Sequence, residues 1–477
     1  MFDLNVYVVV AALAGLLVFL RLSIAWKALV AFIIMSQGFD MVPYIVYGSQ
    51  VWDFGAIMLL MAGAQLIFAK PKEPSIRAVS VTLLRVFIIW LIFCLFYSLL
   101  VYRYPAMNTL KSARQTLIGY LSIFIFLKLF RVDKNALPIF IKWLYFVTYI
   151  LQIVTIVQNI VGSPILYGLS VEYIGAIRYL PVFLPISLFY LWIILSKYFQ
   201  GAGIKIHEWV YGGMVFFVVA TTYTRGLYIA VVVSLLTLLF LLQLGGRLKA
   251  TSAVIFVSFI SLGLTILIAG GLADRVINRG TSGFNILLDT QEAGSQVNVD
   301  TFSGRLGLVK ERIALVIEHN PIVGFGFLHE GDVPVSLRSK FRHGSVVYTP
   351  EMVEKYRYGQ PYVLALYSAD IGWANIVVNT GLVGSLLFLL FVAIFLFSYK
   401  KLKIENAQLS HYRTAFFVQT ITLLILMFNG NTFTNNVQIP ALMIAGYLYC
   451  NAKPRIAETH SEDPRDTLIY SLTKVSK

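Results

Sequence analysis

The sequence predicts an all-α fold, a polytopic bundle of transmembrane helices with one large loop outside the membrane. Of its 477 residues, 58% are hydrophobic and only 13% are charged, and the mean hydropathy is +0.78. Apolar runs of about 20 residues, enough to cross a bilayer as a helix, recur along the chain. Because lipid offers no hydrogen-bond partners, such runs cross only as helices that satisfy their own backbone groups. The composition therefore excludes a soluble protein.

The predicted spans follow one another closely, apart from one long interruption. In chain order they lie at 4–20, 25–45, 54–69, 81–102, 115–130, 137–161, 179–198, 208–223, 226–244, 251–272, 373–398, 412–429 and 436–450. They number about 13, or about 12 if the run at 25–45, which contains Asp40 and Pro43, or the short last run does not cross. The chain divides into a first bundle at 1–272, a loop at 273–372, further spans at 373–450 and a polar tail at 451–477.

Lysines and arginines concentrate in alternate connections between the spans. The basic connections carry Arg21, Lys70, Lys72, Arg77, Lys128, Arg131, Lys134, Lys197, Lys205, Arg247, Lys249, Lys400, Lys401 and Lys403. Because cationic loops stay in the cytoplasm, these connections and the tail are predicted to be cytoplasmic, and the 273–372 loop to lie outside. The net charge of +15 then follows from topology and gives no reason to expect a nucleic-acid partner.

The first span and the two cysteines fit a retained membrane bundle. No cationic segment precedes the first apolar run, so we expect that run to remain as a span, with the N-terminus outside. Cys94 and Cys450 lie within apolar runs. This position predicts two small buried residues and no disulfide framework.

The long loop contains a predicted amphipathic helix in "FSGRLGLVKERIALVIEHNPIVGFGF", residues 302–327. Ser303 is a suitable N-cap, and Pro321 forbids continuation of the helix. Apolar residues recur between them at helical spacing, at Leu306, Val309, Ile313, Val316 and Ile317. Arg305 and Arg312 are seven residues apart, so both fall on the polar face. Gly324 and Gly326 predict a tight turn that lays the loop back over the bundle.

These motifs resemble the O-antigen polymerase and ligase family, of the Wzy and WaaL type. The quoted loop helix with its "P-x-x-G-x-G" turn, followed by "DIGWANIVVNTGLVG" at 370–384, is similar to the large periplasmic loop of that family. "TTYTRGLY" at 221–228 is similar to a short periplasmic turn, and Arg178 in "IRYLPVFLPIS" to an arginine ahead of another span. The resemblance covers the span pattern over most of the chain.

The resemblance implies a metal-independent glycosyltransferase of the bacterial inner membrane, with the loop in the periplasm and without a cofactor. Its donor would be a glycan on undecaprenyl pyrophosphate, and its acceptor a glycan hydroxyl in a polymerase or the lipid A core in a ligase. Membrane lipids and a co-polymerase that regulates chain length are further partners of such an enzyme. A base near the acceptor and cations at the leaving pyrophosphate are what this chemistry requires.

Three arginines are the candidates for binding the pyrophosphate: Arg178, Arg225 and Arg305. All three fall on the predicted outer side, where the lipid headgroup lies. Guanidinium is permanently charged and binds phosphate oxygens in a bidentate manner, so it can hold a leaving pyrophosphate without a metal. Alternatively, each arginine extends its charge to the membrane surface or pairs with a carboxylate. We expect the loop to form a lid whose arginine helix meets Arg178 and Arg225.

Asp370 is the candidate base and, with Arg305, the predicted catalytic pair. The ligases place a histidine 11 residues before the first glycine of "G-x-x-G", as the resemblance has it, and counting back from Gly381 gives Asp370 here. An aspartate can accept a proton from a sugar hydroxyl, although an aspartate before an apolar run also commonly caps the next helix. The missing histidine favours polymerase over ligase.

Other charged residues offer weaker alternatives. His329 and His343 are competing bases, whereas His319 reads as structural. The outer cations Arg103, Lys111 and Arg114 are possible contacts for lipid phosphates. The sequence has no H-E-x-x-H pattern or dense ligand cluster, so it predicts no metal site.

Three rival functions remain open from the sequence. A transporter of lipid-linked glycans would more often show internal repeats or charges at the bilayer midplane, and would not need the long loop. A metal-dependent glycosyltransferase would have only Asp40 and Asp53 as candidate ligands. The third is a loop that binds a partner protein, with catalysis elsewhere.

Overall fold

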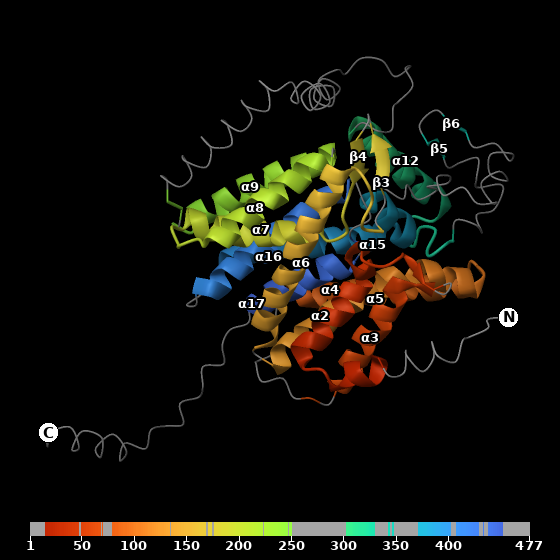
Figure 1. Cartoon of the computed structure of the whole chain (residues 1–477). Helices are drawn as coiled ribbons and strands as arrows, with labels where there is room; N and C mark the ends of the chain where they lie inside the picture. The colour runs from red at the N-terminus through yellow and green to blue at the C-terminus, as the bar shows by residue number, and fades with distance from the viewer. Residues whose placement is uncertain are drawn as a thin grey trace, which may run out of the picture.

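The computed structural model describes residues 15–46, 49–67, 69, 79–133, 135–167, 170–173, 176–222, 224–246, 248–249, 302–329, 342–343, 346–347, 371–401, 407–428, 433 and 437–451. In these ranges the chain is a bundle of helices joined by short connections (Figure 1). Short antiparallel hairpins supplement the helices, among them β3 (Ser170–Tyr173) with β4 (Ala176–Tyr179). The predicted all-α bundle is confirmed for these residues.

Five of the described helices are long and apolar enough to cross a membrane. They are α4 (Val79–Leu100), α5 (Ala106–Val132), α6 (Ala136–Val161), α9 (Arg225–Leu244) and α15 (Gly372–Phe397). With a rise of about 1.5 Å per residue, about 20 helical residues match the hydrocarbon thickness of a bilayer. Each of the five coincides with a predicted span, as expected for a multi-pass membrane protein.

Shorter helices occupy most of the remaining predicted spans. The apolar ones are α2 (Ile24–Met35), α3 (Val51–Gln65), α7 (Leu184–Phe199), α8 (Ile206–Thr221) and α17 (Gln438–Cys450). The helix α16 (Ala407–Leu426) is longer and more polar. The predicted span at 251–272, most of 4–20 and most of the 273–372 loop lie outside the described residues.

The second half of the predicted span at 25–45 is not helical, so that prediction is wrong. Helix α2 ends at Met35, and a turn at Gln37–Asp40 (η1) follows in which every residue has a positive φ, between 53° and 63°. This left-handed backbone costs about 1–2 kcal/mol for each residue with a side chain. A short hairpin of β1 (Ile45–Val46) and β2 (Ser49–Gln50) then leads into α3. Asp40 and Pro43, the two residues that spoke against a membrane span here, lie where the chain leaves the helical conformation.

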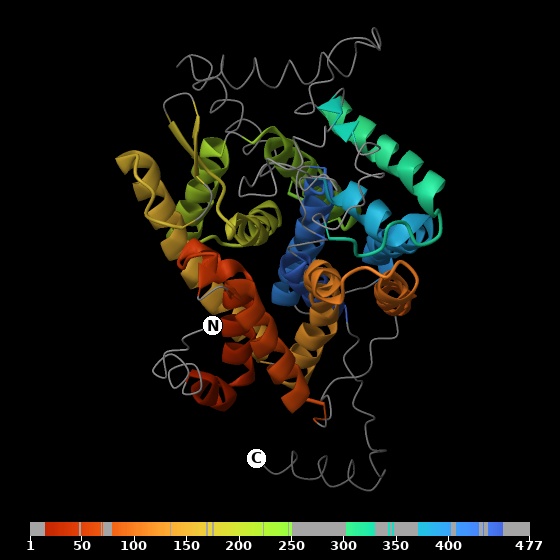
Figure 2. The ribbon, with the colours of Figure 1, turned by 90° about the vertical axis from the view of Figure 1, so that its right-hand side faces the viewer.

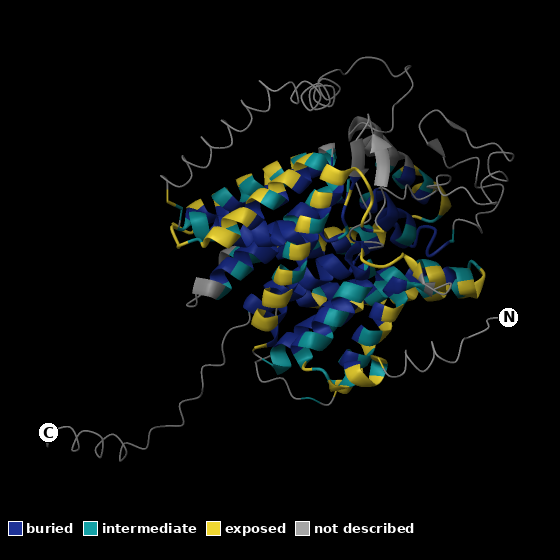
Figure 3. Ribbon diagram, in the orientation of Figure 1, coloured by how far each residue is buried: buried dark blue, intermediate teal, exposed yellow. Residues whose placement is uncertain are grey.

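Two helices form the centre of the bundle. Every residue of α17 is buried, and so are most residues of α7. Figure 3 shows buried residues concentrated in the middle and exposed ones on the outer helices. Several large apolar side chains of α4 and α9 are exposed, which suits helices that face lipid. Cys94 and Cys450 are buried and free, as predicted.

The bundle has two distinct ends. At the "loop end", formed by 101–105, 162–167, 179–183 and 320–328, connections pack on one another, and the Tyr102 hydroxyl donates to the Gly324 carbonyl at 2.7 Å. At the "lysine end", formed by 135–142, 197–208 and 248–249, the Lys249 amide donates to the Phe199 carbonyl at 2.8 Å. Figure 2 faces the loop end, which lies to the right in Figure 1.

The two ends should lie on opposite sides of the membrane. Arg103 and Gly203 are exposed residues at the loop end and the lysine end. We expect Arg103→Cys and Gly203→Cys to react with a membrane-impermeant maleimide from opposite sides in vesicles of known orientation. Both native cysteines are buried, so the wild type provides a low background. Labelling of both variants from one side would contradict the bundle described here.

Candidate functional site at the loop end of the bundle

The backbones of the three predicted arginines lie at the starts of helices or just before them. Arg178 lies in β4, where it pairs with Val171 of β3, shortly before α7. Arg225 is the first residue of α9, after a short turn from α8. Arg305 lies in the first turn of α12 (Phe302–His319). The side chains of these arginines, and the whole of Asp370, lie outside the described residues.

The end of α6 forms hydrogen bonds with the segments that lead to Arg178 and Arg225. Its Asn159 donates from Nδ2 to Thr221 Oγ1, at the end of α8, over 3.1 Å. One residue earlier, Gln158 Oε1 accepts the amides of Ile165 and Leu166, at 2.8 and 2.9 Å, in the connection to β3. These contacts place the end of α8 and the α6–β3 connection beside the same helix end.

The third arginine-bearing segment, α12, lies on the other side of the loop end. It packs on α15, and Figure 2 shows it well apart from the β3–β4 hairpin. The expected meeting of the arginine helix with Arg178 and Arg225 is therefore not seen in the described residues. Segments that carry the candidate arginines therefore lie on two sides of the loop end.

Asp40 anchors the segment that carries Arg178. Its Oδ2 accepts hydrogen bonds from the Tyr179 hydroxyl at 2.8 Å and from the Val182 amide at 3.0 Å. Tyr179 is the last residue of β4, and Val182 lies in the connection from β4 to α7. The backbone carbonyl of Asp40 accepts the Tyr167 amide at 2.8 Å. The left-handed turn presents both oxygens to this segment. Strained backbone of this kind persists only where surrounding contacts compensate its cost, and these hydrogen bonds do so.

Asp40 and Asp53 serve different partners, which weakens the metal-dependent alternative. Asp53 forms a salt bridge of 2.9 Å with Arg114, whose Nη2 also donates to Gln50 Oε1 at 2.8 Å. Arg114 is thus engaged in an ion pair within the bundle, the alternative role that the sequence analysis gave to the outer arginines. Among the residues that the structure describes, no group of three or more His, Cys, Asp or Glu side chains is arranged to hold a metal ion.

The Pro321–Phe327 turn docks on a break in α15, in agreement with the expected tight turn. The helix is interrupted at Gly381, where φ is 66° and ψ is −169°. The Phe325 amide donates to the Val378 carbonyl before the break, and the Leu382 amide donates to the Pro321 carbonyl after it, each at 2.8 Å. The Trp90 indole donates to the Thr380 carbonyl at 2.9 Å. The turn and Trp90 thus satisfy backbone groups that the break would leave without partners.

Glycine is required at three positions of this contact. Gly324, Gly326 and Gly381 all have positive φ, between 63° and 69°. A Cβ atom at Gly381 would collide with the Ile322 carbonyl, and one at Gly326 would collide with the Ser98 hydroxyl. That hydroxyl accepts the Phe327 amide at 2.9 Å. The motifs "P-x-x-G-x-G" and "G-x-x-G" are therefore two halves of one packing contact.

An aromatic cluster covers the docked turn. The His319 ring stacks on Phe325 with centroids 4.2 Å apart, and Tyr102 lies 5.4 Å from His319 and 5.2 Å from Tyr104. Burial, with a smaller contribution from Tyr102, raises the pKa of Tyr104 above its ordinary value, so its hydroxyl stays neutral. This packing agrees with the prediction that His319 has a structural role. His329 has a described backbone, while Tyr348, Tyr356 and the other loop tyrosines lie outside the described residues.

Arg312 is fully buried, so its predicted position on a solvated face is wrong. Its neighbour one turn later, Val316, is also fully buried and packs with Phe325 and Val378. Ile317, predicted for the apolar face, is 53% exposed. The helix is thus rotated from the orientation that the apolar spacing predicts, because α15 and the docked turn cover the side that carries Arg312. Burial of a guanidinium is costly without polar neighbours, and periodicity alone gave no signal of it.

The described residues show arginine-bearing segments at the loop end, anchored by Asp40 and by the break in α15. Sequence analysis missed Asp40 as an anchor and the break at Gly381, although an aspartate within an apolar run and an isolated glycine in a span are signals of both. No protein-family model and no curated protein matches the chain.

Loss of the Asp40 carboxylate should loosen the connection that carries Arg178. In Asp40→Ala, the buried Tyr179 hydroxyl and the half-buried Val182 amide lose their acceptor, which costs about 1–3 kcal/mol for a buried donor. Hydrogen exchange measured by mass spectrometry should become faster in 164–183 and unchanged in 320–328. Asp133→Ala, which removes a carboxylate at the lysine end, is the control. Equal exchange in Asp40→Ala and the wild type would contradict the anchoring role.

Alanine at the break in α15 should destabilise the protein. Gly381 occupies a backbone region that is essentially closed to other residues, which costs about 1–3 kcal/mol in addition to the collision with Ile322. We expect Gly381→Ala to lower the melting temperature in detergent by several degrees. Gly213→Ala is the matched control, because that helical glycine has no neighbour within 4 Å of an added Cβ. Equal melting temperatures of the two variants would show that the break is not required.

Proposed function

We propose that the chain is an inner-membrane glycosyltransferase that polymerises undecaprenyl-pyrophosphate-linked repeat units into O-antigen or exopolysaccharide, with its site at the loop end. The observation that carries the proposal is the placement of three arginine-bearing segments, β4, the start of α9 and α12, at one end of the bundle (Figure 2). An enzyme that acts on a membrane-bound pyrophosphate needs cations at one membrane surface. Arginines meet this need without a metal.

The proposed reaction transfers a glycan between two lipid-linked chains. The acceptor hydroxyl attacks the anomeric carbon of the donor glycan and loses its proton to a base, for which Asp370 is the candidate. The bond between the anomeric carbon and the pyrophosphate oxygen breaks, and undecaprenyl pyrophosphate leaves. Arg178, Arg225 and Arg305 stabilise the negative charge that develops on this leaving group.

The docked turn supports the proposal because it gives the loop a defined attachment. The Pro321–Phe327 turn begins two residues after the end of α12, and its hydrogen bonds to α15 restrain that helix end. In the sequence, Asp370 lies two residues before Gly372, where α15 begins, and α15 packs on the arginine helix α12. We expect a substrate bound beside this contact to meet both the candidate base and the arginine helix.

The transfer assay uses purified protein with its undecaprenyl-pyrophosphate repeat unit in the presence of EDTA. We expect the wild type to lengthen chains, and Arg225→Ala to lower the rate by at least about 100-fold, as loss of one group that stabilises transition-state charge does. Asp370→Asn should lower it by about 100-fold or more. Lys310→Gln is the control, because it removes an exposed cation of α12 to which no role in the reaction is given.

Each other outcome has a definite meaning. Glycan loaded onto the lipid A core, with no chain extension, would assign the chain to the ligases. Full activity in Arg225→Ala and Asp370→Asn would reject the roles given to these residues. No transfer to either acceptor by folded wild type would contradict the enzyme and favour a transporter of lipid-linked glycans.

A further inference from the structure

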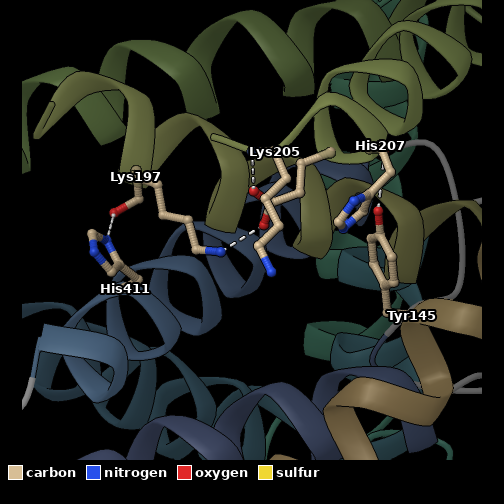
Figure 4. Close-up of polar contacts among 7 residues, drawn as sticks. Tyr145, Lys197, Lys205, His207 and His411 are labelled. Carbon is tan, nitrogen blue, oxygen red and sulfur yellow. Dashed lines mark hydrogen bonds and ion pairs between the residues drawn. The ribbon is translucent and has the colours of Figure 1, made fainter. Parts of the chain in front are cut away.

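A basic pocket lies at the lysine end of the bundle, away from the candidate site. It has a volume of about 490 Å³ and lies among α6, α7 and α8, with Tyr412 of α16 on its wall. Three lysines line it, Lys142 of α6, Lys197 of α7 and Lys205 just before α8. Figure 4 shows Lys197 beside Lys205, and Tyr145 beneath His207. The proposed glycan transfer uses none of these residues.

The pocket carries more positive charge than its own carboxylate compensates. Glu208 accepts from Lys197 Nζ at 2.6 Å and from the Lys205 backbone amide at 3.0 Å. In the described part of the chain, no carboxylate lies within ion-pair distance of the ammonium groups of Lys142 and Lys205. Two lysines thus remain available to an anion. Both are exposed, and their charges add at one pocket.

The position of α8 adds to the attraction for an anion. This 16-residue helix begins at Ile206, so its positive dipole end lies at the mouth of the pocket, beside Lys205 and His207. Helix N-termini and lysine ammonium groups both bind phosphate oxygens. Two of the three tyrosine hydroxyls on the wall are occupied, since Tyr190 donates to the Ile141 carbonyl at 2.6 Å and Tyr145 to the His207 carbonyl at 3.4 Å. The lysines therefore provide the polar recognition.

Exposed apolar side chains occur on two of the helices that form the pocket. Trp143 and Phe146 of α6 and Trp209 and Val210 of α8 are exposed. Tryptophans gather at the interface between membrane and water, and the surrounding apolar surface faces acyl chains. A dissolved anion would gain nothing from this surface, whereas a lipid would place its headgroup in the pocket and its chains along α6 and α8. Basic pockets between helices at the cytoplasmic side bind lipid headgroups in this way.

We infer that this pocket binds the phosphate headgroup of an anionic phospholipid, with Lys142 and Lys205 as its principal contacts. Glu208 holds Lys197 and limits the affinity of the site. The inference does not depend on the proposed glycosyltransferase, because the pocket and the candidate site lie at opposite ends of the bundle.

Native mass spectrometry of the full-length protein, with phosphatidylglycerol added in detergent, tests the inference. We expect the double variant Lys142→Gln/Lys205→Gln to bind the lipid about tenfold more weakly than the wild type. The control is Lys27→Gln/Lys128→Gln, which removes the same charge; these lysines donate to Gln65 and to the Ile67 carbonyl, outside the pocket. Its affinity should change less than about twofold.

A second variant tests the role of the carboxylate. Glu208→Gln keeps an acceptor for the Lys205 amide but releases Lys197, so we expect affinity for phosphatidylglycerol to rise several-fold. A pocket that is only structural would not give this gain. Equal weakening by both double lysine variants, at unchanged melting temperatures, would overturn the inference in favour of general surface charge.

Inorganic phosphate distinguishes the two sources of a phosphate group. In millimolar excess it should not displace bound phosphatidylglycerol, because it lacks the acyl chains that α6 and α8 contact. Displacement at concentrations equal to those of the lipid would overturn the assignment to a lipid and identify a site for free phosphate.

Discussion

Backbone hydrogen bonds between the Pro321–Phe327 turn and the break in α15 are the interaction on which the loop end depends. A helix interrupted near lipid exposes amides and carbonyls that have no water to bind, which costs several kcal/mol for each group left without a partner. Here the amides of Phe325 and Leu382 and the indole of Trp90 form hydrogen bonds that supply the missing partners. The same contact fixes the end of α12, so the arginine helix cannot be separated from the span that follows the loop.

A comparable exchange of strain for hydrogen bonds occurs on the other side of the loop end. The left-handed turn that ends at Asp40 is costly in isolation, yet it directs a side-chain and a backbone oxygen toward the connection between α6 and α7. Two anchors, Asp40 and the break in α15, therefore hold the segments that carry Arg178 and Arg305. We propose that a lipid-linked pyrophosphate binds between these segments.

Composition and hydropathy were sufficient to predict the membrane bundle, because a membrane-spanning helix needs little more than length and apolarity. They failed where tertiary contacts overrule local pattern. The run at 25–45 is mostly apolar, yet its helix ends at Met35. The turn that follows brings the Asp40 carboxylate to Tyr179 and Val182, and the sequence pattern does not show these contacts. The spacing of Arg312 predicts a solvent-facing position, but the residue is buried because α15 covers it. The arginines of the candidate site were found only through a resemblance of motifs, and nothing in their spacing alone predicts which of them share a ligand.

Binding of undecaprenyl pyrophosphate to the purified protein in EDTA tests the central claim most directly. Isothermal titration in nanodiscs would compare it with undecaprenyl monophosphate, which has the same chain and lacks one phosphate. We expect saturable binding of the pyrophosphate that is at least about tenfold tighter than binding of the monophosphate, and loss of this preference in Arg178→Ala/Arg225→Ala. Equal affinity for both lipids in the wild type would contradict a pyrophosphate site at the loop end.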